Sequence, residues 1–515
     1  MMQKVNRLTV CLLLLLTTAC KPVEAVSSGS QCEGRVFVES GSQNIVSTLP
    51  NNVLMRTLNP SFFGFNLEWV DFQQDLWDSK KLQVRPSVVE WLKPFNGAVY
   101  RYPGGTGSNY LNWRDTVGEQ ASRPVRPHVD WLGPIAPRFG FDEYLDFVEM
   151  VDGRPWVVLN IYGGYDGEGS AAVLAKDAAD WAIYAAKRAK AGKPSVLRWE
   201  LGNELDRGKT LWPPAKYSKV AGQAVKAVLE RQPEAKFVGM LQDWPAQKQF
   251  TVSEYSRTVM AELNPAVGEF AHHLYYEEAR WGSVSERMRF VCRSVDDTRA
   301  SGLKQAAFWI TEHTRGLPGQ GDFGKWKRDW PKSSNLEAAM VVAESYIAAT
   351  QFPEIQGMFL HSLGTAHGPW PLFNSSQQDV HPSAVYWGIR ILRDNMLQNV
   401  LVSQVKSRND EGSIGDHDVR ATVLTDVNQH NYAVWAVNRY GASSKLSLKI
   451  PSLSGKQVKT SFTYISDSNK ESNNYLVTTN IVPQTRESAM TFGADGVAVI
   501  ELPPYSVSAL RMTLQ

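Results

Sequence analysis

The stretch LRWELGNE, at residues 197–204, is an apolar run that ends at the acid Glu204. A second stretch, AAFWITE at residues 306–312, has the same form and ends at Glu312. Each is typical of a buried strand that stops at a carboxylate. Either glutamate alone is more simply a surface residue at a strand end. If both strands belong to one parallel barrel, however, their carboxyl ends meet at the same rim, where barrels hold their functional groups.

Six more apolar runs extend this pattern along the chain. Together with the two above they are eight candidate strands, at residues 62–67, 98–102, 156–161, 195–201, 237–241, 270–274, 306–311 and 357–361. Helical periodicity fills most of the gaps, at residues 86–92, 141–150, 171–189, 217–230, 284–300, 335–349 and 384–395. Strands that alternate with helices predict a (β/α)8 TIM barrel, which we place at residues 61–397.

The pattern of apolar and polar residues changes after residue 397. Short β-branched and apolar runs stand at residues 419–424, 432–437, 445–450, 458–465 and 497–502, separated by Gly, Ser, Asn and Pro. This spacing predicts a C-terminal antiparallel β-sandwich at residues 398–515. We expect residues 21–60 to be a tether and an N-terminal strand that joins the sandwich, because residues 36–49 have strand-like character.

The first twenty residues are typical of an export signal. Lys4 and Arg7 precede an apolar run at residues 8–16, which is too short to span a bilayer. Small residues then lead to Cys20, as in a bacterial lipoprotein signal whose cysteine is lipidated; ordinary cleavage near Ala25 is the alternative. We therefore expect an exported protein, periplasmic or an outer-membrane lipoprotein of a bacterium, that meets the membrane only through its N-terminal lipid anchor.

Charge and cysteine content exclude several classes of protein. The formal net charge of +2 and the lack of a basic tract argue against a nucleic-acid partner. Export would permit a disulfide between Cys32 and Cys292, although sequence does not give the distance between them. Neither cysteine belongs to a cluster with metal-ligand spacing, so we expect no zinc site.

Two carboxyl groups that face each other can cleave a glycosidic bond, one as acid/base and one as nucleophile. A general acid must be protonated near neutral pH, and the apolar neighbours of Glu204 favour this. The amide of Asn203 could bond a sugar hydroxyl beside the reacting carbon. Glu312 needs the opposite, a low pKa, and Arg101 at the end of the second strand can supply the positive charge. The alternative for Arg101 is a structural salt bridge under a turn.

Aromatic residues and histidines also fall at predicted strand ends. In HHLYY, at residues 272–276, His273 and Tyr275 share one face of the strand, and the tyrosine could orient Glu312. The adjacent histidines could instead be core residues or metal ligands. Trp370 follows the eighth strand on a loop. It could be a platform on which a sugar ring stacks, or it could be a core residue that fills the space between barrel and sandwich. The same two alternatives, functional or structural, hold for further rim residues: Glu68, Trp69, His313, His361 and His367.

These motifs resemble the retaining glycoside hydrolases of clan A. Asn203-Glu204 on strand four, Glu312 on strand seven and His-x-Tyr on strand six carry the resemblance. WELGNE at 199–204 is similar to heparanase and β-glucuronidase relatives, whereas RYPGG at 101–105 is similar to α-L-arabinofuranosidases. Residues 437–439 and 502–507 resemble the sandwich that follows those barrels.

The resemblance implies double displacement on a poly- or oligosaccharide, with Glu204 as acid/base and Glu312 as nucleophile. Arg101, Asn203 and Tyr275 would support them, and this mechanism would require no metal and no organic cofactor. Retention requires carboxyls roughly 5–5.5 Å apart, whereas inversion requires about 6.5–9.5 Å. Because the motifs resemble two different families, they do not determine which sugar the protein would recognise. Basic residues after strands six and seven could recognise uronic or sulfated sugars, or be solvated loop charges: Arg280, Arg315, Lys325 and Arg328.

Two other classes of protein compete with the hydrolase. One is a lipoprotein that captures polysaccharide at the surface without cutting it, which would not need a matched pair of acids. The other is a solute-binding protein for a transporter, which would need two similar lobes rather than an uninterrupted eightfold alternation. Replacing Glu312 by alanine would distinguish the hydrolase from the capture lipoprotein. The substitution would abolish turnover if the protein is a hydrolase, but it would spare binding if the protein only captures polysaccharide. Linkage, exo or endo cleavage and oligomeric state do not follow from the sequence.

Overall fold

The computed structural model describes most of the chain after the leader. The described residues are 32–67, 76–126, 134–164, 169–207, 211–243, 250–277, 282–303, 305–317, 323–363, 368–375, 379–409, 417–475 and 480–515. Several sequence-based predictions lie outside them: the signal at 1–20 with Cys20, and Glu68, Trp69, Arg280 and His367.

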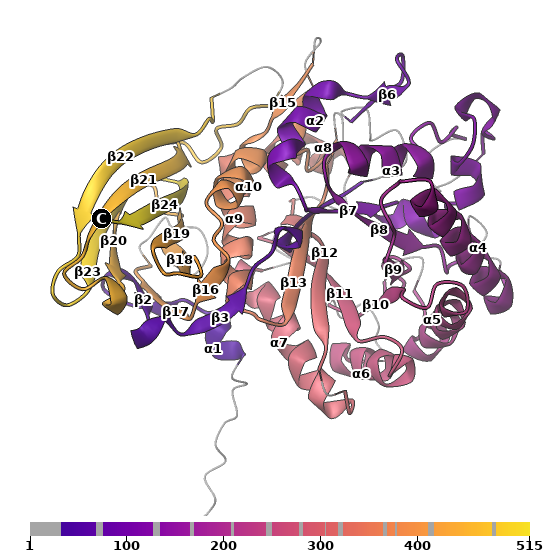
Figure 1. Cartoon of the computed structure of the whole chain (residues 1–515), viewed down its shortest axis with the longest axis horizontal. Helices are drawn as coiled ribbons and strands as arrows, with labels where there is room; N and C mark the ends of the chain where they lie inside the picture. The colour runs from indigo at the N-terminus through magenta and orange to yellow at the C-terminus, as the bar shows by residue number, and fades with distance from the viewer. Residues whose placement is uncertain are drawn as a thin grey trace, which may run out of the picture.

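Eight parallel strands close into a barrel, which confirms the predicted TIM-barrel fold (Figure 1). Each lies on one of the predicted apolar runs, because strands buried on both faces need continuous apolar sequence. In chain order they are β4 (Phe63–Asn66), β7 (Val99–Tyr102), β8 (Arg154–Leu159), β9 (Arg198–Leu201), β10 (Lys236–Met240), β11 (Glu269–Tyr276), β12 (Ala307–Arg315) and β13 (Ile355–Leu360).

Helices alternate with these strands and surround the barrel (Figure 1). The sequence did not predict α6, whose start is marked by a capping box of Thr251 and Glu254 and whose buried face repeats at three- and four-residue spacing. The main helices are α2 (Pro86–Leu92), α3 (Phe141–Met150), α4 (Ala171–Lys190), α5 (Pro214–Leu229), α6 (Val252–Leu263), α7 (Val284–Ala300), α8 (Phe323–Asp329), α9 (Leu336–Thr350) and α10 (Ala384–Asp394).

Two sheets pack into the predicted sandwich. One has the order β1 (Glu39–Ser40), β17 (Ser403–Ser407), β2 (Asn44–Thr48), β20 (Ser444–Lys449), β23 (Val497–Leu502). The other has the order β22 (Gln484–Thr491), β21 (Gln457–Ser466), β24 (Ser506–Leu514), β19 (Asn431–Asn438), β18 (Val419–Thr425), β16 (Asn399–Leu401), β3 (Leu54–Thr57). Their shared core includes Val46, Leu448, Val434 and Leu510. Two pairs, β1–β17 and β2–β20, are parallel.

The N-terminal segment differs from the prediction of one strand near Val36. Val36 ends a short helix, α1 (Glu33–Val36), and three strands follow it. Because β2 joins one sheet and β3 the other, this segment is a structural part of the sandwich rather than a tether from residue 33 onward. The predicted boundaries at residues 60 and 397 stay predictions. Helix α9 lies between barrel and sandwich (Figure 1), and its described side chains are buried throughout.

Two short hairpins complete the described strands: β5 (Trp77–Asp78) with β6 (Gln83–Val84), and β14 (Phe373–Ser375) with β15 (Val380–Pro382). Within the described part of the chain, no helix combines the length and the apolar character that a membrane span needs.

A disulfide joins Cys32, just before α1, to Cys292 in α7. The Cα atoms lie 5.4 Å apart and both residues are buried. This bond attaches the N-terminal segment to the barrel across a sequence separation of 260 residues.

We predict that Cys32→Ser lowers the free energy of unfolding. Removing a native disulfide restores chain entropy to the unfolded state and typically costs roughly 2–5 kcal/mol. Urea denaturation followed by tryptophan fluorescence measures the difference. Cys292→Ser should lose a similar amount, since either substitution removes the same bond. Equal stability of the oxidised and fully reduced wild-type protein would contradict the prediction.

Candidate active site

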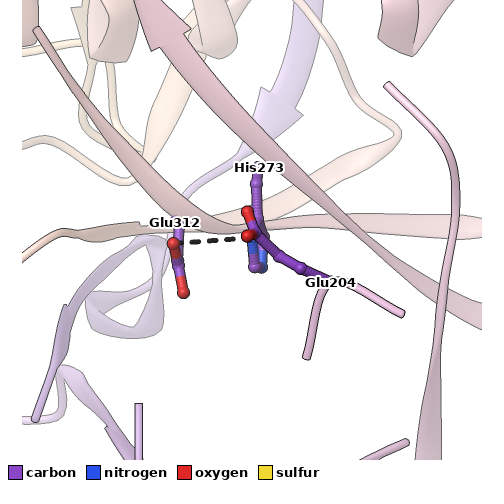
Figure 2. A group of neighbouring side chains, drawn as sticks. All are labelled: Glu204, His273 and Glu312. Atoms are coloured by element: carbon purple, nitrogen blue, oxygen red, sulfur yellow. Dashed lines mark hydrogen bonds and ion pairs between the residues drawn. The ribbon is translucent and has the colours of Figure 1, made fainter. Parts of the chain in front are cut away.

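Glu204 and Glu312 meet at the carboxyl end of the barrel. Glu204 lies in the turn after β9, at a positive φ of 49°, and Glu312 lies on β12. One carboxylate oxygen from each glutamate and one ring nitrogen of His273 all lie within 4.8 Å of one another (Figure 2). The structure therefore brings both predicted acids, and the histidine of β11, to one point.

Glu312 is buried and surrounded by hydrogen-bond donors. The Tyr275 hydroxyl donates to its Oε2 over 3.0 Å, and Arg101 Nη1 donates to its Oε1 over 3.0 Å. His273 Nδ1 and His361 Nδ1 lie 3.5 and 3.9 Å from Oε2. Burial raises the pKa of Glu312, but His273, His361 and Arg101 outweigh it and hold the pKa below its usual value. Glu312 is thus a carboxylate at neutral pH.

Arg101 uses every donor that a guanidinium has. It is fully buried, and its Nε and Nη2 form a fork on Glu200 over 2.7 and 3.0 Å. Nη1 also donates to Asn66 Oδ1 and Nη2 to Asn203 Oδ1, over 2.7 and 2.8 Å. With the bond to Glu312, all five N–H groups are satisfied. Both predicted roles of Arg101 therefore hold together: it is a structural ion pair and it places positive charge beside Glu312.

Glu204 contacts a different pair of cations. His273 Nδ1 lies 2.9 Å, and Arg207 Nη1 3.7 Å, from its Oε1, and about a quarter of its side chain is exposed. Burial raises its pKa, but Arg207 and His273 together lower it to about 2. The prediction of a protonated Glu204 is therefore wrong for the free protein. The reason lies in Arg207, which stands three residues beyond Glu204 and for which the sequence predicted no role.

His273 holds the proton that Glu204 lacks. Its Nε2 lies 3.1 Å from Thr311 Oγ1, and that hydroxyl donates its own hydrogen to Glu200. Nε2 must therefore be the donor to Thr311, while Nδ1 faces the carboxylate of Glu204. Burial lowers the pKa of His273, but Glu312 and Glu204 raise it above its usual value. Geometry and charge agree that the ring is an imidazolium.

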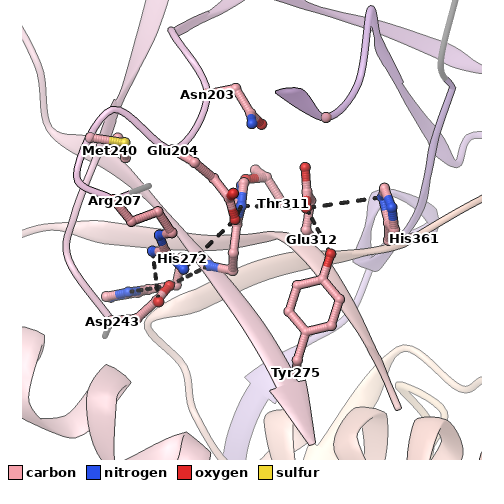
Figure 3. A network of polar contacts seen from close by, with 12 residues as sticks. Asn203, Glu204, Arg207, Met240, Asp243, His272, Tyr275, Thr311, Glu312 and His361 are labelled. Carbon is pink, nitrogen blue, oxygen red and sulfur yellow. Dashed lines mark hydrogen bonds and ion pairs between the residues drawn. The ribbon is translucent and has the colours of Figure 1, made fainter. Parts of the chain in front are cut away.

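A second ion network supports this side of the rim (Figure 3). Arg207 Nη2 lies 2.8 Å from both Asp206 Oδ2 and Asp243 Oδ1, and Asp243 Oδ2 accepts the His273 backbone N–H over 2.6 Å. No role was predicted from the sequence for these residues or for Glu200. Asp243 follows β10 closely, so the strand-end position that identified Glu204 could have revealed it.

Asn203 presents an unused donor. Its Oδ1 accepts from Arg101, and its backbone N–H and C=O pair with the side-chain amide of Asn109 over 3.2 and 2.7 Å. Its Nδ2 is buried and has no hydrogen-bond partner among the described residues. A buried donor of this kind costs free energy unless a ligand satisfies it.

Trp370 is 8% exposed and packs against Tyr275 and His361, with ring centroids 5.6 and 5.4 Å apart. Its Nε1 donates to the carbonyl of Arg315 over 2.7 Å. It is therefore a wall behind Tyr275 rather than an open stacking platform or a plug between domains.

The predicted basic residues divide into two kinds. Arg315 is buried and pairs with Glu337 over 2.7 Å, so it does not face a ligand. Lys325 and Arg328 lie exposed on α8.

Glu204, His273 and Glu312 are also the described residues that could ligate a cation together. Their ligand atoms are, however, already engaged: His273 bonds through both ring nitrogens, and each Glu312 oxygen accepts a hydrogen bond. The site is organised by hydrogen bonds among its own side chains.

Comparison with known proteins points to one class. Residues 91–289 match the model of the alpha-L-arabinofuranosidase 1 domain. The predicted resemblance to α-L-arabinofuranosidases is thereby confirmed over this part of the chain, while the resemblance to heparanase stays a prediction.

Individual relatives are similar over part of their length. A probable α-L-arabinofuranosidase C from Aspergillus fumigatus is 33% identical over 173 residues, 32% of this chain and 33% of the relative. The α-L-arabinofuranosidase C of Emericella nidulans is 30% identical over 207 residues, 37% of this chain and 40% of the relative. The matches thus span well under half the length of these curated relatives.

Solved structures share the whole fold at low identity. The α-L-arabinofuranosidase from Thermotoga maritima, solved as an arabinose complex, is 16% identical with a TM-score of 0.75, covering 92% of this chain and 100% of its own. The arabinofuranosidase from Xanthomonas axonopodis pv. citri is also 16% identical, with a TM-score of 0.73 and coverage of 92% and 100%.

Proposed function

We propose that this chain is a retaining glycoside hydrolase that releases L-arabinofuranose from an oligo- or polysaccharide. The observation that carries the proposal is the approach of Glu204 and Glu312, whose carboxylate oxygens lie within 4.8 Å of each other. Retaining enzymes hold their carboxyls about 5–5.5 Å apart, whereas inverting enzymes need roughly 6.5–9.5 Å to admit a water. The match to the α-L-arabinofuranosidase domain supports the choice of sugar.

In this mechanism Glu312 attacks the anomeric carbon and forms a glycosyl ester, while Glu204 protonates the departing oxygen. The proton comes from His273, whose Nδ1 lies 2.9 Å from Glu204 Oε1. The Glu204–His273 pair therefore stores one proton and releases it through Glu204, the member that is partly exposed.

Hydrolysis of the ester restores the starting state. Esterification removes the negative charge of Glu312, which is the strongest of the charges that raise the pKa of His273. Glu204, now a carboxylate beside a neutral imidazole, takes a proton from water as that water attacks the anomeric carbon. The proton returns to the pair and Glu312 is again a free carboxylate.

Asn203 and Arg101 would serve substrate and nucleophile respectively. The Nδ2 of Asn203, which has no hydrogen-bond partner in the described part of the chain, suits a donor to the sugar hydroxyl beside the reacting carbon, a bond that tightens in the transition state of such reactions. Arg101 keeps Glu312 ionised and fixed in direction. The alternative, a surface polysaccharide-binding lipoprotein without activity, is less favoured because a binder has no use for two opposed carboxylates, one of which is paired with a protonated histidine.

We also propose that the protein is exported and lipidated at Cys20. The leader sequence supports this, as does the Cys32–Cys292 disulfide, a bond that persists in oxidising compartments.

We predict that Cys20→Ala moves the protein from the membrane fraction to the soluble fraction of a Gram-negative host, because a lipid anchor needs the cysteine thiol. Immunoblots of the two fractions measure it. Cys32→Ser, which removes a different thiol, should stay with the membranes. A Cys20→Ala variant that remains membrane-bound would contradict the anchor.

We predict that the wild-type protein hydrolyses 4-nitrophenyl α-L-arabinofuranoside, and that NMR of the first product shows retained anomeric configuration. The matching β-D-xyloside and β-D-glucuronide should be poor substrates. Glu312→Ala should abolish turnover, because no other carboxylate can form the ester. Glu204→Ala should lower kcat roughly 100- to 10,000-fold on natural substrates, the usual contribution of general acid–base catalysis.

Azide distinguishes the two roles. It should rescue Glu204→Ala with retained configuration, by attacking the ester, and Glu312→Ala with inverted configuration, by replacing the nucleophile. Inverted product from the wild-type protein, or binding without turnover of any glycoside, would overturn the proposed function.

We predict a bell-shaped pH profile of kcat/KM, in which Glu312 determines the acid limb and the Glu204–His273 pair determines the alkaline limb. Activity requires ionised Glu312, whose pKa is lowered from 4.5, so the acid limb lies below that value. It also requires the stored proton, which is lost as pH rises through the His273 pKa, raised from 6.5, so the alkaline limb lies above it. His273→Asn should move the alkaline limb to lower pH, because Glu204 alone loses its proton at a carboxyl pKa.

His430→Asn is the matched control, since His430 is an exposed residue of the sandwich. It should leave both limbs in place. An alkaline limb that does not move in His273→Asn would show that His273 is not the proton store.

A further inference from the structure

A buried arginine of the sandwich reaches the end of a barrel strand. Arg439 directly follows β19 and is 1% exposed. Its Nη1 and Nη2 form a fork on the two carboxylate oxygens of Glu277, the residue that directly follows β11. Nη1 also donates to Oε2 of Glu344, on α9, over 2.6 Å. One guanidinium thus ties the sandwich to both the barrel and the helix between them.

The opposite oxygen of Glu344 extends this contact. Its Oε1 accepts from Arg420 Nε, on β18, over 3.0 Å, and Arg420 Nη2 donates to Ser285 Oγ, on α7, over 2.6 Å. Two arginines and two glutamates therefore lie together in a buried cluster, which we call the Arg439 cluster: Arg439, Arg420, Glu277 and Glu344. The buried His417 borders it, with Nε2 3.0 Å from Glu344 Oε1. Removing one member leaves a buried charge uncompensated, so the cluster resists rearrangement.

Strand β11 is the element that the cluster holds. It carries His273 and Tyr275, the two side chains that contact the Glu312 carboxylate from this strand. Tyr275 stands two residues before Glu277, and the carbonyl of Tyr276 between them accepts the backbone N–H of Gly316 over 2.7 Å. A shift of Glu277 would therefore move Tyr275 with it.

The neighbouring strand has a weaker link of the same kind. Arg315, which ends β12, pairs with Glu337 of α9 over 2.7 Å, and Lys470 of the sandwich pairs with Glu337 over 3.1 Å. Lys470 is 37% exposed, so solvent screens this contact. The buried Arg439 cluster is the stronger constraint of the two.

We propose that Arg439 is a positioning residue: by holding Glu277 it sets the end of β11 so that the Tyr275 hydroxyl and the His273 ring meet Glu312. The inference rests on the proposed function, because it assigns to the sandwich a part in the chemistry of the barrel. Catalytic groups must be held closely, and a displacement of about 1 Å can cost roughly 100-fold in rate.

The test is a double-mutant cycle between Arg439→Lys and Tyr275→Phe. Lysine keeps the charge but cannot form a fork on a carboxylate. We expect Arg439→Lys to lower kcat roughly 10- to 100-fold with a smaller change in KM, because orientation rather than binding is lost. If Arg439 acts through Tyr275, the double variant should be about as slow as the slower single variant, since coupled residues are not additive.

Arg486→Lys is the matched control. Arg486 is likewise a sandwich arginine, but its partner is a neutral hydroxyl, Tyr464 Oη at 2.5 Å, and it lies on the exposed strand β22. It should leave kcat unchanged. If Arg439→Lys does not fold, Glu277→Gln replaces it in the same cycle, because the amide keeps the size of the side chain but removes its charge and one of the two acceptors of the fork.

A second measurement does not depend on turnover. Hydrogen–deuterium exchange of residues 272–277 should be faster in Arg439→Lys than in the wild-type protein or in Arg486→Lys. Additive losses in the cycle, a wild-type kcat in Arg439→Lys, or unchanged exchange at 272–277 would each overturn the proposal. A wild-type protein without glycosidase activity would refute the proposed function instead, and faster exchange would then still support the hold of Arg439 on β11.

Discussion

The buried guanidinium of Arg101 is the interaction on which the rim of the barrel depends. Its partners Asn66, Glu200 and Glu312 come from β4, β9 and β12, and Arg101 itself comes from β7. A single desolvated cation thus connects four strands, and it is tolerated only because all five of its N–H groups meet oxygen acceptors. The same contacts that hold the strands in register help to keep Glu312 ionised and fix the orientation of its carboxylate. The stability of the rim and the reactivity of Glu312 therefore depend on the same residue.

Arg207 and His273 lower the pKa of Glu204, and His273, His361 and Arg101 lower that of Glu312, so His273 is a second cation that acts on both acids. Arg101 and His273 differ in whether they can release a proton. Arginine keeps its charge at every relevant pH, whereas an imidazolium can give up a proton and take it back. Thr311 and Glu200 link the two cations by hydrogen bonds, so the fixed charge and the exchangeable one lie in a single network.

The sequence predicted the barrel well because its strands are buried on both faces and leave continuous apolar runs. Helix α6 was not predicted, although its capping box and the spacing of its buried residues were both readable in the sequence. Strand ends pointed to Glu204, Glu312 and Tyr275, since position along a strand determines what reaches the rim. The charge state of Glu204 was mispredicted, because it depends on Arg207 and His273, whose distances are set by tertiary structure. For the same reason Glu277 and Arg439, which are 162 residues apart, could not be paired from the sequence.

The two sheets of the sandwich are built from both sides of the barrel in the sequence. Strand β2 lies between β17 and β20, and β24, the last strand in chain order, lies between β19 and β21. During synthesis the first strands therefore wait, unpaired, until several hundred residues have emerged from the ribosome, a delay typical of folds with distant pairings. A chain that stops before β24 would carry a complete barrel sequence, but one of its two sheets would lack the strand that joins β19 to β21 and would leave both of those edges unpaired.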